Sequence, residues 1–201
     1  KNAGASAIKI QTYNPDSKTI NSNKKDFQIN EGLWQGKNLY NLYDEAHTPY
    51  KWHHELFSYS KQIGITLFST PFDETAVDLL ENLQTPAYKI ASFEITDLYL
   101  IEYVAKKNKP IFISTGMASI DEISEAVEVV KKTGNTNILL FHCISSYPTP
   151  TEKLNLNNLK FLEKEFNVSI GLSDHSIDNL ASSLAISLGA VAIEKHFKLD
   201  D

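Results

Sequence analysis

The sequence predicts an α/β protein, a (β/α)8 TIM barrel that lacks its first strand–helix unit and the end of the barrel. Three observations predict this fold class. Short apolar runs recur along the chain, helical patterns separate them, and almost every run ends on polar side chains. Continuous apolar runs are typical of parallel strands covered on both faces. Strands that alternate with helices indicate βαβ units and a parallel sheet.

Seven apolar runs are predicted as strands, and they lie at 6–13, 65–72, 87–94, 110–117, 138–145, 169–175 and 191–197. The helical patterns lie at 73–83, 96–108, 119–134, 155–166 and 176–190. Asp73 and Thr96 are candidate N-caps, and Ser119 with Glu122 has the spacing of a capping box. Gly134 is a candidate stop. An open doubly wound sheet is the alternative, but no GxGxxG motif follows a strand, which disfavours its dinucleotide-binding version.

Both ends of the sequence look cut from a longer protein. Gly4 reads as the stop of a helix directly before the first strand, and the end at "KLDD" is equally abrupt. A missing first strand and helix would complete a barrel of eight units. We therefore expect the barrel to extend beyond this chain in both directions.

Residues 14–63 interrupt the alternation of strands and helices. We predict a long βα loop over about 14–50 and a helix only from about Thr48. Loops of this length in compact domains are usually functional or disordered. Aromatic residues argue against disorder, and they are Trp34, Tyr40, Tyr43 and Trp52. In a barrel, this loop would lie on the face that carries the active site.

Composition limits the classes of protein to which the chain can belong. A chain of 201 residues that is 42% hydrophobic can bury one large core, so residues 1–201 are predicted as one catalytic domain. The net charge of −6 disfavours a nucleic-acid partner. No apolar run approaches the ~18–20 residues of a membrane span, and no signal peptide is visible. The single cysteine, Cys143, cannot form an internal disulfide, so we expect a cytoplasmic protein.

Polar side chains gather at the carboxyl ends of the predicted strands, where parallel barrels carry their chemistry. They are Lys9, Gln11, Ser69, Thr70, Lys89, Ser92, Glu94, Ser114, Thr115, His142, Ser145, Ser173, Asp174, His175, Glu194, Lys195 and His196. Burying such groups without partners costs about 1–3 kcal/mol each. We therefore expect a polar ligand or water to satisfy them.

Two lysines interrupt apolar strands and need an anion. Lys9 and Lys89 are each flanked by isoleucine or tyrosine, where an unpaired ammonium is costly. The hydroxyl groups nearby favour a phosphate or carboxylate ligand. The alternative is an internal ion pair of Lys89 with Glu94 or Glu194.

The histidines have three possible roles. His175 and His196 end consecutive strands, and each alone is more often a satisfied core or rim group. Together, two neutral imidazoles can share a divalent ion, with waters and substrate as the other ligands. A general base is the third possibility. His142 is expected to pack or to support the site, whereas solvated or rim positions are expected for His47, His53 and His54.

Other polar groups are expected to be structural. Cys143 is predicted to be a small buried residue rather than a nucleophile, because nothing in the sequence indicates a depressed pKa. The acidic residues of 121–128 are predicted to form a solvated helix face. Asp174 has two possible roles, which are to orient an imidazole or to cap a helix that starts at Ser176.

Seven blocks of the sequence, in order, resemble the sialic acid synthase (N-acetylneuraminate synthase) family. They are "KIQTY", "STPFDETAVDLL", "AYKIASFE", "ISTGMAS", "FHCISSYPTP", "GLSDHS" and "IEKHF". The resemblance runs from about residue 3 to residue 201. The stretches "KIQTYNPDSKTI" and "LYDEAHTPYKWH" resemble the pseudaminic acid synthase branch more than the N-acetylneuraminate branch.

The resemblance implies a transferase of carbohydrate biosynthesis that serves bacterial surface glycans. Such an enzyme condenses phosphoenolpyruvate with an N-acetylated amino sugar in its aldehyde form, and gives a nine-carbon ulosonic acid and phosphate. In the pseudaminic branch the sugar is 2,4-diacetamido-2,4,6-trideoxy-altrose. N-acetylneuraminate synthase, which uses N-acetylmannosamine, is the alternative.

The resemblance also implies a site. It implies that His175 and His196 hold a divalent metal, Mn²⁺ or Mg²⁺, and that Glu94 contacts a sugar hydroxyl or relays a proton. The phosphoenolpyruvate contacts that it implies are Lys9, Thr70, Lys89, Ser92, Ser114 and Ser173. The implied sugar contacts are Gln11, Glu94 and Tyr147, and a family asparagine position falls on Ser145.

Two parts of the family pattern have no counterpart in the sequence. They are a glutamate on the first strand and a C-terminal antifreeze-like domain, which supplies an arginine to the partner's site in a swapped dimer. The resemblance therefore implies a homodimer for the full-length protein and little activity for this chain alone. Two other functions stay open. They are a Schiff-base aldolase that uses Lys89 or Lys9, and an anion-binding protein without enzymatic activity.

Overall fold

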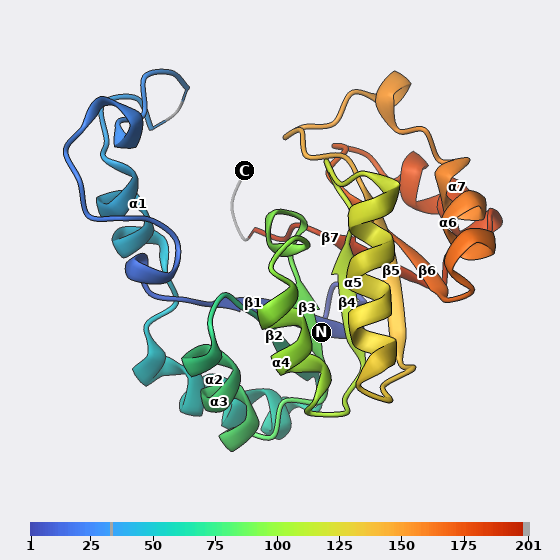
Figure 1. Cartoon of the computed structure of the whole chain (residues 1–201), viewed down its shortest axis with the longest axis horizontal. Coiled ribbons are helices and arrows are strands. Elements are labelled where there is room, and N and C mark those ends of the chain that lie inside the picture. Colours follow the sequence, from blue (N-terminus) through green and yellow to red (C-terminus); the bar gives the residue numbers. More distant parts are fainter. Residues whose placement is uncertain (33, 199–201) are drawn as a thin grey trace. The chain divides into compact units, whose positions relative to one another are not determined.

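The computed structural model describes residues 1–32 and 34–198 of the chain. Residue 33, in the predicted loop, and residues 199–201, at the end of the predicted domain, lie outside the described residues. The chain forms two compact units, Lys1–Pro86 and Ala87–Asp201, and each is described by itself. Figure 1 labels their elements. Across the described parts of the chain, no helix combines the length and the apolar character that a membrane crossing requires.

The first unit is built on a pair of parallel strands. β1 (Ala7–Thr12) pairs with β2 (Thr66–Pro71), and the helices α2 (Tyr50–Ile63) and α3 (Glu74–Asn82) pack against β2. The carboxylate of Asp73 accepts a hydrogen bond from the Ala76 amide at 2.7 Å, so the predicted N-cap of α3 is confirmed.

The long segment between β1 and α2 is more regular than predicted. It contains two short 3-10 helices, η1 (Pro15–Ser17) and η2 (Lys25–Phe27), and the helix α1 (Leu39–Ala46). The prediction of a loop over about 14–50 is therefore wrong at α1. The Asn38 side chain caps this helix by accepting from the Tyr40 amide at 2.8 Å, and Tyr43 packs edge-on against Tyr13. The predicted helix from about Thr48 is confirmed as α2.

The second unit holds the remaining strands of the described chain, which pair in parallel in sequence order. They are β3 (Tyr88–Ile90), β4 (Ile111–Ser114), β5 (Ile138–Cys143), β6 (Ser169–Asp174) and β7 (Ala192–Lys195). The helices between them are α4 (Leu98–Ala105), α5 (Ile120–Lys132), α6 (Asn158–Phe166) and α7 (Leu180–Ser187). Short 3-10 helices are η3 (Ser92–Glu94) and η4 (Thr151–Lys153).

Apolar side chains between the helices and strands form the core of this unit. Ile90, Ile111, Ile113 and Leu140 lie on neighbouring strands and are fully buried. α4 and α5 pack side by side (Figure 1), and both α6 and α7 pack against β6. These strands therefore carry apolar side chains at most positions, as parallel strands covered by helices do.

Every predicted strand and helix of this unit exists, but the predicted boundaries are too wide. The predicted strand 87–94 ends at Ile90 because the chain turns into η3. Helix α4 is capped by Asp97, which accepts from the Leu100 amide at 3.0 Å, rather than by Thr96. The predicted helix 176–190 begins only at Leu180. Asp174 therefore does not cap a helix at Ser176, and that alternative for its role is wrong.

The other helix signals are borne out. The Ser119 hydroxyl accepts from the Glu122 amide at 3.2 Å, and the Glu122 carboxylate accepts from the Ser119 amide at 2.7 Å. This reciprocal pair confirms the capping box of α5. Asp121, Glu125 and Glu128 are exposed, so the solvated acidic face of α5 is also confirmed.

One histidine of the first unit is buried, against the sequence prediction. His53 lies on the inner face of α2 and is 0% exposed, whereas we expected a solvated or rim position. Its Nε2 is 2.7 Å from the Thr12 hydroxyl, and its Nδ1 is 3.2 Å from the Pro49 carbonyl. The neighbouring His54 is exposed and His47 half-buried, as expected. His53 and His54 differ in exposure because adjacent residues of a helix face different directions.

Burial of His53 should make stability fall on acidification. Burial lowers its pKa, although backbone hydrogen bonds at Pro49 and Tyr50 oppose the shift. Below an ordinary histidine pKa of about 6.5, the unfolded chain takes up a proton that the folded chain refuses. Stability should therefore be complete above about pH 6.5 and decline as the pH falls toward the lowered pKa. Urea unfolding at a series of pH values measures this slope.

Two variants separate His53 from the other histidines. His53→Gln should flatten the pH dependence of the urea midpoint, because this uptake of a proton on unfolding is lost. His54→Gln, on the exposed side of the same helix, should leave the slope unchanged. An equal slope in wild type and His53→Gln would contradict the prediction.

Candidate active site

A buried lysine lies at the centre of the polar groups in the second unit. Lys89 is 2% exposed and donates to the Ser114 hydroxyl at 2.7 Å. It also pairs with Glu194 Oε1 at 3.3 Å, and the Ser173 hydroxyl donates to the same oxygen at 2.9 Å. The Phe141 ring centre lies 5.4 Å from the ammonium. Of the two partners considered for an internal ion pair, Glu194 forms it.

The register of β6 and β7 explains which side chains meet. Ser173 is opposite Glu194, and Asp174 is opposite Lys195. Successive side chains of a strand point to opposite faces. Ser173 and Glu194 therefore share the face that holds Lys89, whereas Asp174 and Lys195 share the other face.

The structure brings the two predicted imidazoles together. The ring centres of His175 and His196 are 5.2 Å apart, and the Tyr147 ring lies 4.1 Å and 5.4 Å from them. His175 Nδ1 donates to the Ile144 carbonyl at 2.8 Å, because a carbonyl can only accept. This bond orients the ring. The other ring nitrogen, Nε2, is 3.4 Å from the Ser173 hydroxyl.

A cradle of small polar groups surrounds Gly116. Its amide donates to the Ser92 hydroxyl at 3.1 Å, and Ser92 lies 3.7 Å from the Cys143 sulfur. A Cβ at Gly116 would lie 2.5 Å from Ser145 Oγ and 2.9 Å from Ser92 Oγ. Only glycine allows the backbone to approach these groups so closely. The sequence analysis did not predict this requirement for glycine at 116, although the small residues of "ISTGMAS" indicate a closely packed segment.

Cys143 is buried as predicted, and its thiol lies among polar groups, with the Ser92 hydroxyl 3.7 Å from the sulfur. Burial raises its pKa, and hydrogen bonds with His175 and Ser92 outweigh this effect and lower the pKa overall. Burial likewise lowers the pKa of His175, but its bonds to Cys143 and the Ile144 carbonyl prevail and raise it. This thiol–imidazole contact could not be predicted from the sequence, because it joins β5 to the end of β6.

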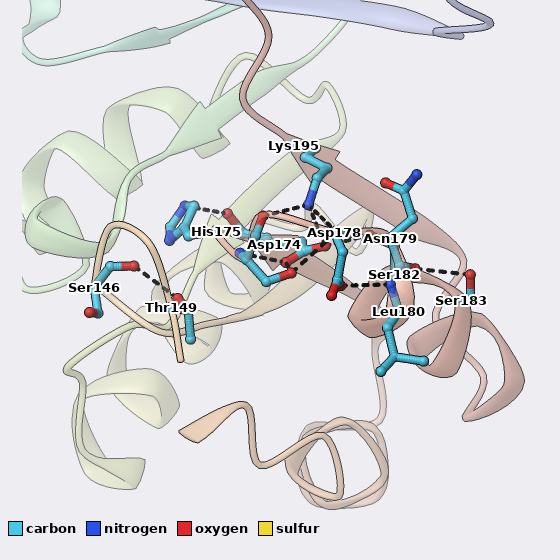
Figure 2. A network of polar contacts seen from close by, with 12 residues as sticks. Ser146, Thr149, Asp174, His175, Asp178, Asn179, Leu180, Ser182, Ser183 and Lys195 are labelled. Carbon is cyan, nitrogen blue, oxygen red and sulfur yellow. Dashed lines mark hydrogen bonds and ion pairs between the residues drawn. The ribbon is translucent and has the colours of Figure 1, made fainter. Parts of the chain in front are cut away.

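Asp174 and Lys195 form a second polar network beside the first. Asp174 is 1% exposed and pairs with Lys195 at 2.9 Å (Figure 2). Burial raises the pKa of Asp174, and its hydrogen bonds to Lys195, Ser176 and Ser182 outweigh this and lower it. Both residues were predicted at strand ends, but their pairing was not.

The remaining predicted residues of this unit occupy varied positions. His142 is buried and bonded through Nε2 to the Leu154 carbonyl at 2.8 Å, which confirms its packing role. Thr115 donates to the Phe141 carbonyl at 3.0 Å and is structural. Glu94 lies on η3 rather than on a strand and is half-buried, as is Ser145, whereas Tyr147 is exposed.

The predicted residues of the first unit lie on its two strands, β1 and β2. Lys9 is half-buried and Gln11 exposed on β1. Gln11 is opposite Thr70 in the register. Thr70 is fully buried, and its hydroxyl has no hydrogen-bond partner within the described residues. Ser69 belongs to the network of His53, through a 2.7 Å contact with Thr12.

The NeuB family model matches residues 1–201, the whole chain. The chain belongs to the NeuB family. It is 48% identical over 200 residues to the pseudaminic acid synthase of Campylobacter jejuni, a match that covers 100% of this chain and 58% of that protein. It is 46% identical to the pseudaminic acid synthase of Helicobacter pylori, covering 100% of this chain and 59% of that protein. This NeuB-family chain therefore spans less than two thirds of the length of these relatives.

A solved structure of a sialic acid synthetase shares the fold. The N-acetylneuraminic acid synthetase of Leptospira borgpetersenii, solved in complex with citrate, matches with a TM-score of 0.86 at 33% identity. That match covers 99% of this chain and 65% of the other chain. The predicted family and the predicted fold class, an incomplete (β/α)8 barrel, are confirmed.

Proposed function

We propose that the protein condenses phosphoenolpyruvate with an acetamido-sugar aldehyde to give a nine-carbon ulosonic acid and phosphate. The best candidate is a pseudaminic acid synthase, which uses 2,4-diacetamido-2,4,6-trideoxy-altrose. One observation carries the proposal. A buried lysine framed by hydroxyls lies in the same unit as two adjacent imidazoles, in a chain 48% identical to a pseudaminic acid synthase.

Lys89 supports the binding of an anionic substrate. Phosphoenolpyruvate carries a phosphate and a carboxylate, and a buried ammonium with hydroxyl donors suits either group. Ser114 and Ser173 already contact the Lys89–Glu194 pair. An entering anion would replace Glu194 as a partner of Lys89 and accept from these hydroxyls. The family resemblance adds Lys9, Thr70 and Ser92 to the proposed contacts, and the unsatisfied Thr70 hydroxyl is a donor of the required kind.

Gly116→Ala should weaken phosphoenolpyruvate binding through Ser92. The added Cβ displaces the hydroxyls of Ser92 and Ser145, which lie within 2.9 Å of it. We expect a KM for phosphoenolpyruvate that is raised roughly 10–100-fold, since a displacement of about 1 Å in a site can have that effect. Steady-state kinetics measure it. The additional change Ser145→Ala removes the shortest contact and should recover part of the lost affinity for phosphoenolpyruvate. Wild-type kinetics in Gly116→Ala would contradict the proposal that these close contacts support phosphoenolpyruvate binding.

The imidazoles fit a divalent cation, Mn²⁺ or Mg²⁺. Within the described ranges, no group of three or more His, Cys, Asp and Glu side chains could hold a metal. We propose that water and substrate would fill the positions that the two imidazoles leave. The bond from His175 Nδ1 to the Ile144 carbonyl orients the ring and leaves the Nε2 lone pair as the ligand, with His196 beside it. Such a cation supplies Lewis-acid polarisation of the sugar carbonyl.

The remaining roles rest on the family resemblance. Glu94 is proposed to contact a sugar hydroxyl or relay a proton. Gln11, Ser145 and Tyr147 are proposed sugar contacts, and the exposed Tyr147 ring stacks beside His175 at 4.1 Å between ring centres. We further propose that residues 1–201 act as one catalytic domain of a cytoplasmic homodimer.

The alternatives predict different observations. A Schiff-base aldolase needs a neutral amine, whereas Lys89 forms an ion pair with Glu194 and contacts Ser114. Borohydride with substrate would trap a lysine adduct in an aldolase and none in the proposed synthase. An anion-binding protein would bind phosphoenolpyruvate and release no phosphate with any sugar.

Phosphate release tests the function and its sugar together. The intact enzyme is incubated with Mn²⁺, phosphoenolpyruvate and each candidate sugar in turn. We expect release with the diacetamido-altrose substrate. Activity only with N-acetylmannosamine would instead establish an N-acetylneuraminate synthase, and no release with any acetamido sugar would refute the proposed condensation.

A further inference from the structure

Two charged residues that the proposed chemistry does not use stand directly before the two histidines in sequence. Asp174 precedes His175 at the end of β6, and Lys195 precedes His196 at the end of β7. The two are opposite each other in the strand register. They therefore meet on the face of the sheet that carries α7, opposite to the face of Ser173 and Glu194.

Asp174 is held by a full set of donors. One carboxylate oxygen accepts from the Ser176 amide at 2.8 Å and the Ser176 hydroxyl at 2.6 Å. The other accepts from Ser182 on α7 at 2.6 Å and from Lys195 at 2.9 Å. Figure 2 shows this network. A buried carboxylate with four such bonds has one orientation, because each lost bond would leave it partly unsolvated.

Lys195 uses all three of its N–H groups. Besides the Asp174 carboxylate, it donates to the carbonyls of Ser176 and Asp178, each at 2.8 Å (Figure 2). An ammonium has three donors and no acceptor. Lys195 thus clamps the loop that follows His175 onto the strand that leads into His196. On the other side, the His175 carbonyl accepts from the Thr149 amide at 2.9 Å.

We propose that Asp174 and Lys195 are positioning residues that set the separation of His175 and His196, and so preorganise a divalent-cation site. This inference rests on the proposed function, because it takes the two imidazoles as metal ligands. Asp174 and Lys195 do not touch the cation. They act through the backbone of the loop and strand to which the ligands belong.

Electrostatics and positioning predict opposite effects for one variant. Removing the positive charge of Lys195 should by Coulomb's law alone strengthen the binding of a nearby cation. If Lys195 positions the ligands, its removal should weaken binding instead. Loss of supporting partners of metal ligands typically lowers metal affinity about 10–100-fold. Lys195→Met is therefore the decisive variant.

The test measures Mn²⁺ affinity and loop protection in the intact enzyme. Mn²⁺ affinity is read from the electron paramagnetic resonance of free Mn²⁺, and loop protection from hydrogen exchange of the Thr149 amide. In Lys195→Met, we expect affinity to fall about 10–100-fold and Thr149 to exchange faster. Lys195→Arg should retain most of both. The matched control is Lys132→Met, which removes an exposed lysine that pairs with Glu128 on α5, and it should change neither.

Coupling shows whether the two residues act as one unit. The double variant Asp174→Asn/Lys195→Met should lose no more affinity than Lys195→Met alone, because the single change already breaks the clamp. Unchanged or tighter Mn²⁺ binding in Lys195→Met would overturn the inference. A fall in affinity with unchanged exchange at Thr149 would also overturn it, since the effect would not pass through the loop.

A separate variant tests the proposed metal site. If His175→Ala binds Mn²⁺ as tightly as wild type, the proposed ligand is wrong. The positioning role is then tested only by hydrogen exchange of the Thr149 amide in Lys195→Met. Faster exchange supports the role of Lys195 in holding the loop, and unchanged exchange overturns it.

Discussion

Replacing Lys89 with methionine should abolish phosphate release and destabilise the fold by about 3–5 kcal/mol, the usual cost of removing one partner of a buried ion pair. The substitution keeps the apolar stem but removes the charge. It takes the ammonium away from Glu194, whose side chain is 14% exposed and still accepts from the Ser173 hydroxyl. Urea unfolding measures the loss of stability, and coupled phosphate detection measures turnover.

A double variant separates the two roles of Lys89. In Lys89→Met/Glu194→Gln neither charge remains, so the uncompensated carboxylate is removed and most of the stability should return. Activity should not return, because the anion still lacks its ammonium. If the double variant recovered both, the pair would be purely structural and the proposed phosphoenolpyruvate site would be wrong.

An exposed lysine provides the control. Lys106 pairs with Glu102 at 2.7 Å on the surface of α4, where both side chains are largely exposed. Exposed pairs of this kind contribute about 0.3–0.5 kcal/mol. Lys106→Met should therefore leave turnover unchanged and stability within that range.

The second large effect is expected at His175. Removal of metal by a chelator should abolish activity, and Mn²⁺ should restore it in wild type but not in His175→Ala. Because His175 is a proposed direct ligand, its loss should lower Mn²⁺ affinity by more than the roughly 10–100-fold typical of supporting partners. Titration of Mn²⁺ into the chelated enzyme, followed by phosphate release, measures both quantities.

The exposed His54 on α2 is the matched control for this experiment. His54→Ala removes an imidazole without touching the candidate site and should behave as wild type. Activity that survives exhaustive chelation would remove the metal from the proposed chemistry. Restoration of His175→Ala by ordinary Mn²⁺ concentrations would remove His175 from the ligand set.

The positions of the chemical groups could be predicted to a large extent from the sequence. Strand periodicity placed Lys89, Ser173 and Glu194 at strand ends, and the structure joins these three in one network. The same periodicity placed His175 and His196 on neighbouring strands, and their rings are 5.2 Å apart. These predictions succeeded because parallel strands in sequence order bring their carboxyl ends to one edge.

Contacts between distant segments could not be predicted. His53 was misplaced because its burial depends on Thr12, which is 41 residues away. The close contacts of Gly116 depend on Ser92 on η3 and on Ser145, which follows β5. Helix α1 was missed because its single cap, Asn38, is a weak local signal in a polar segment.

The family, the alternation of strands and helices, and the candidate residues could all be predicted from local patterns and from blocks in fixed order. The pairing of Lys89 with Glu194 and of Asp174 with Lys195 became apparent only in the folded chain. For Lys89, the sequence left both Glu94 and Glu194 as candidate partners. The choice among them depends on strand register and on the face to which each side chain points, and both are set when the strands pair.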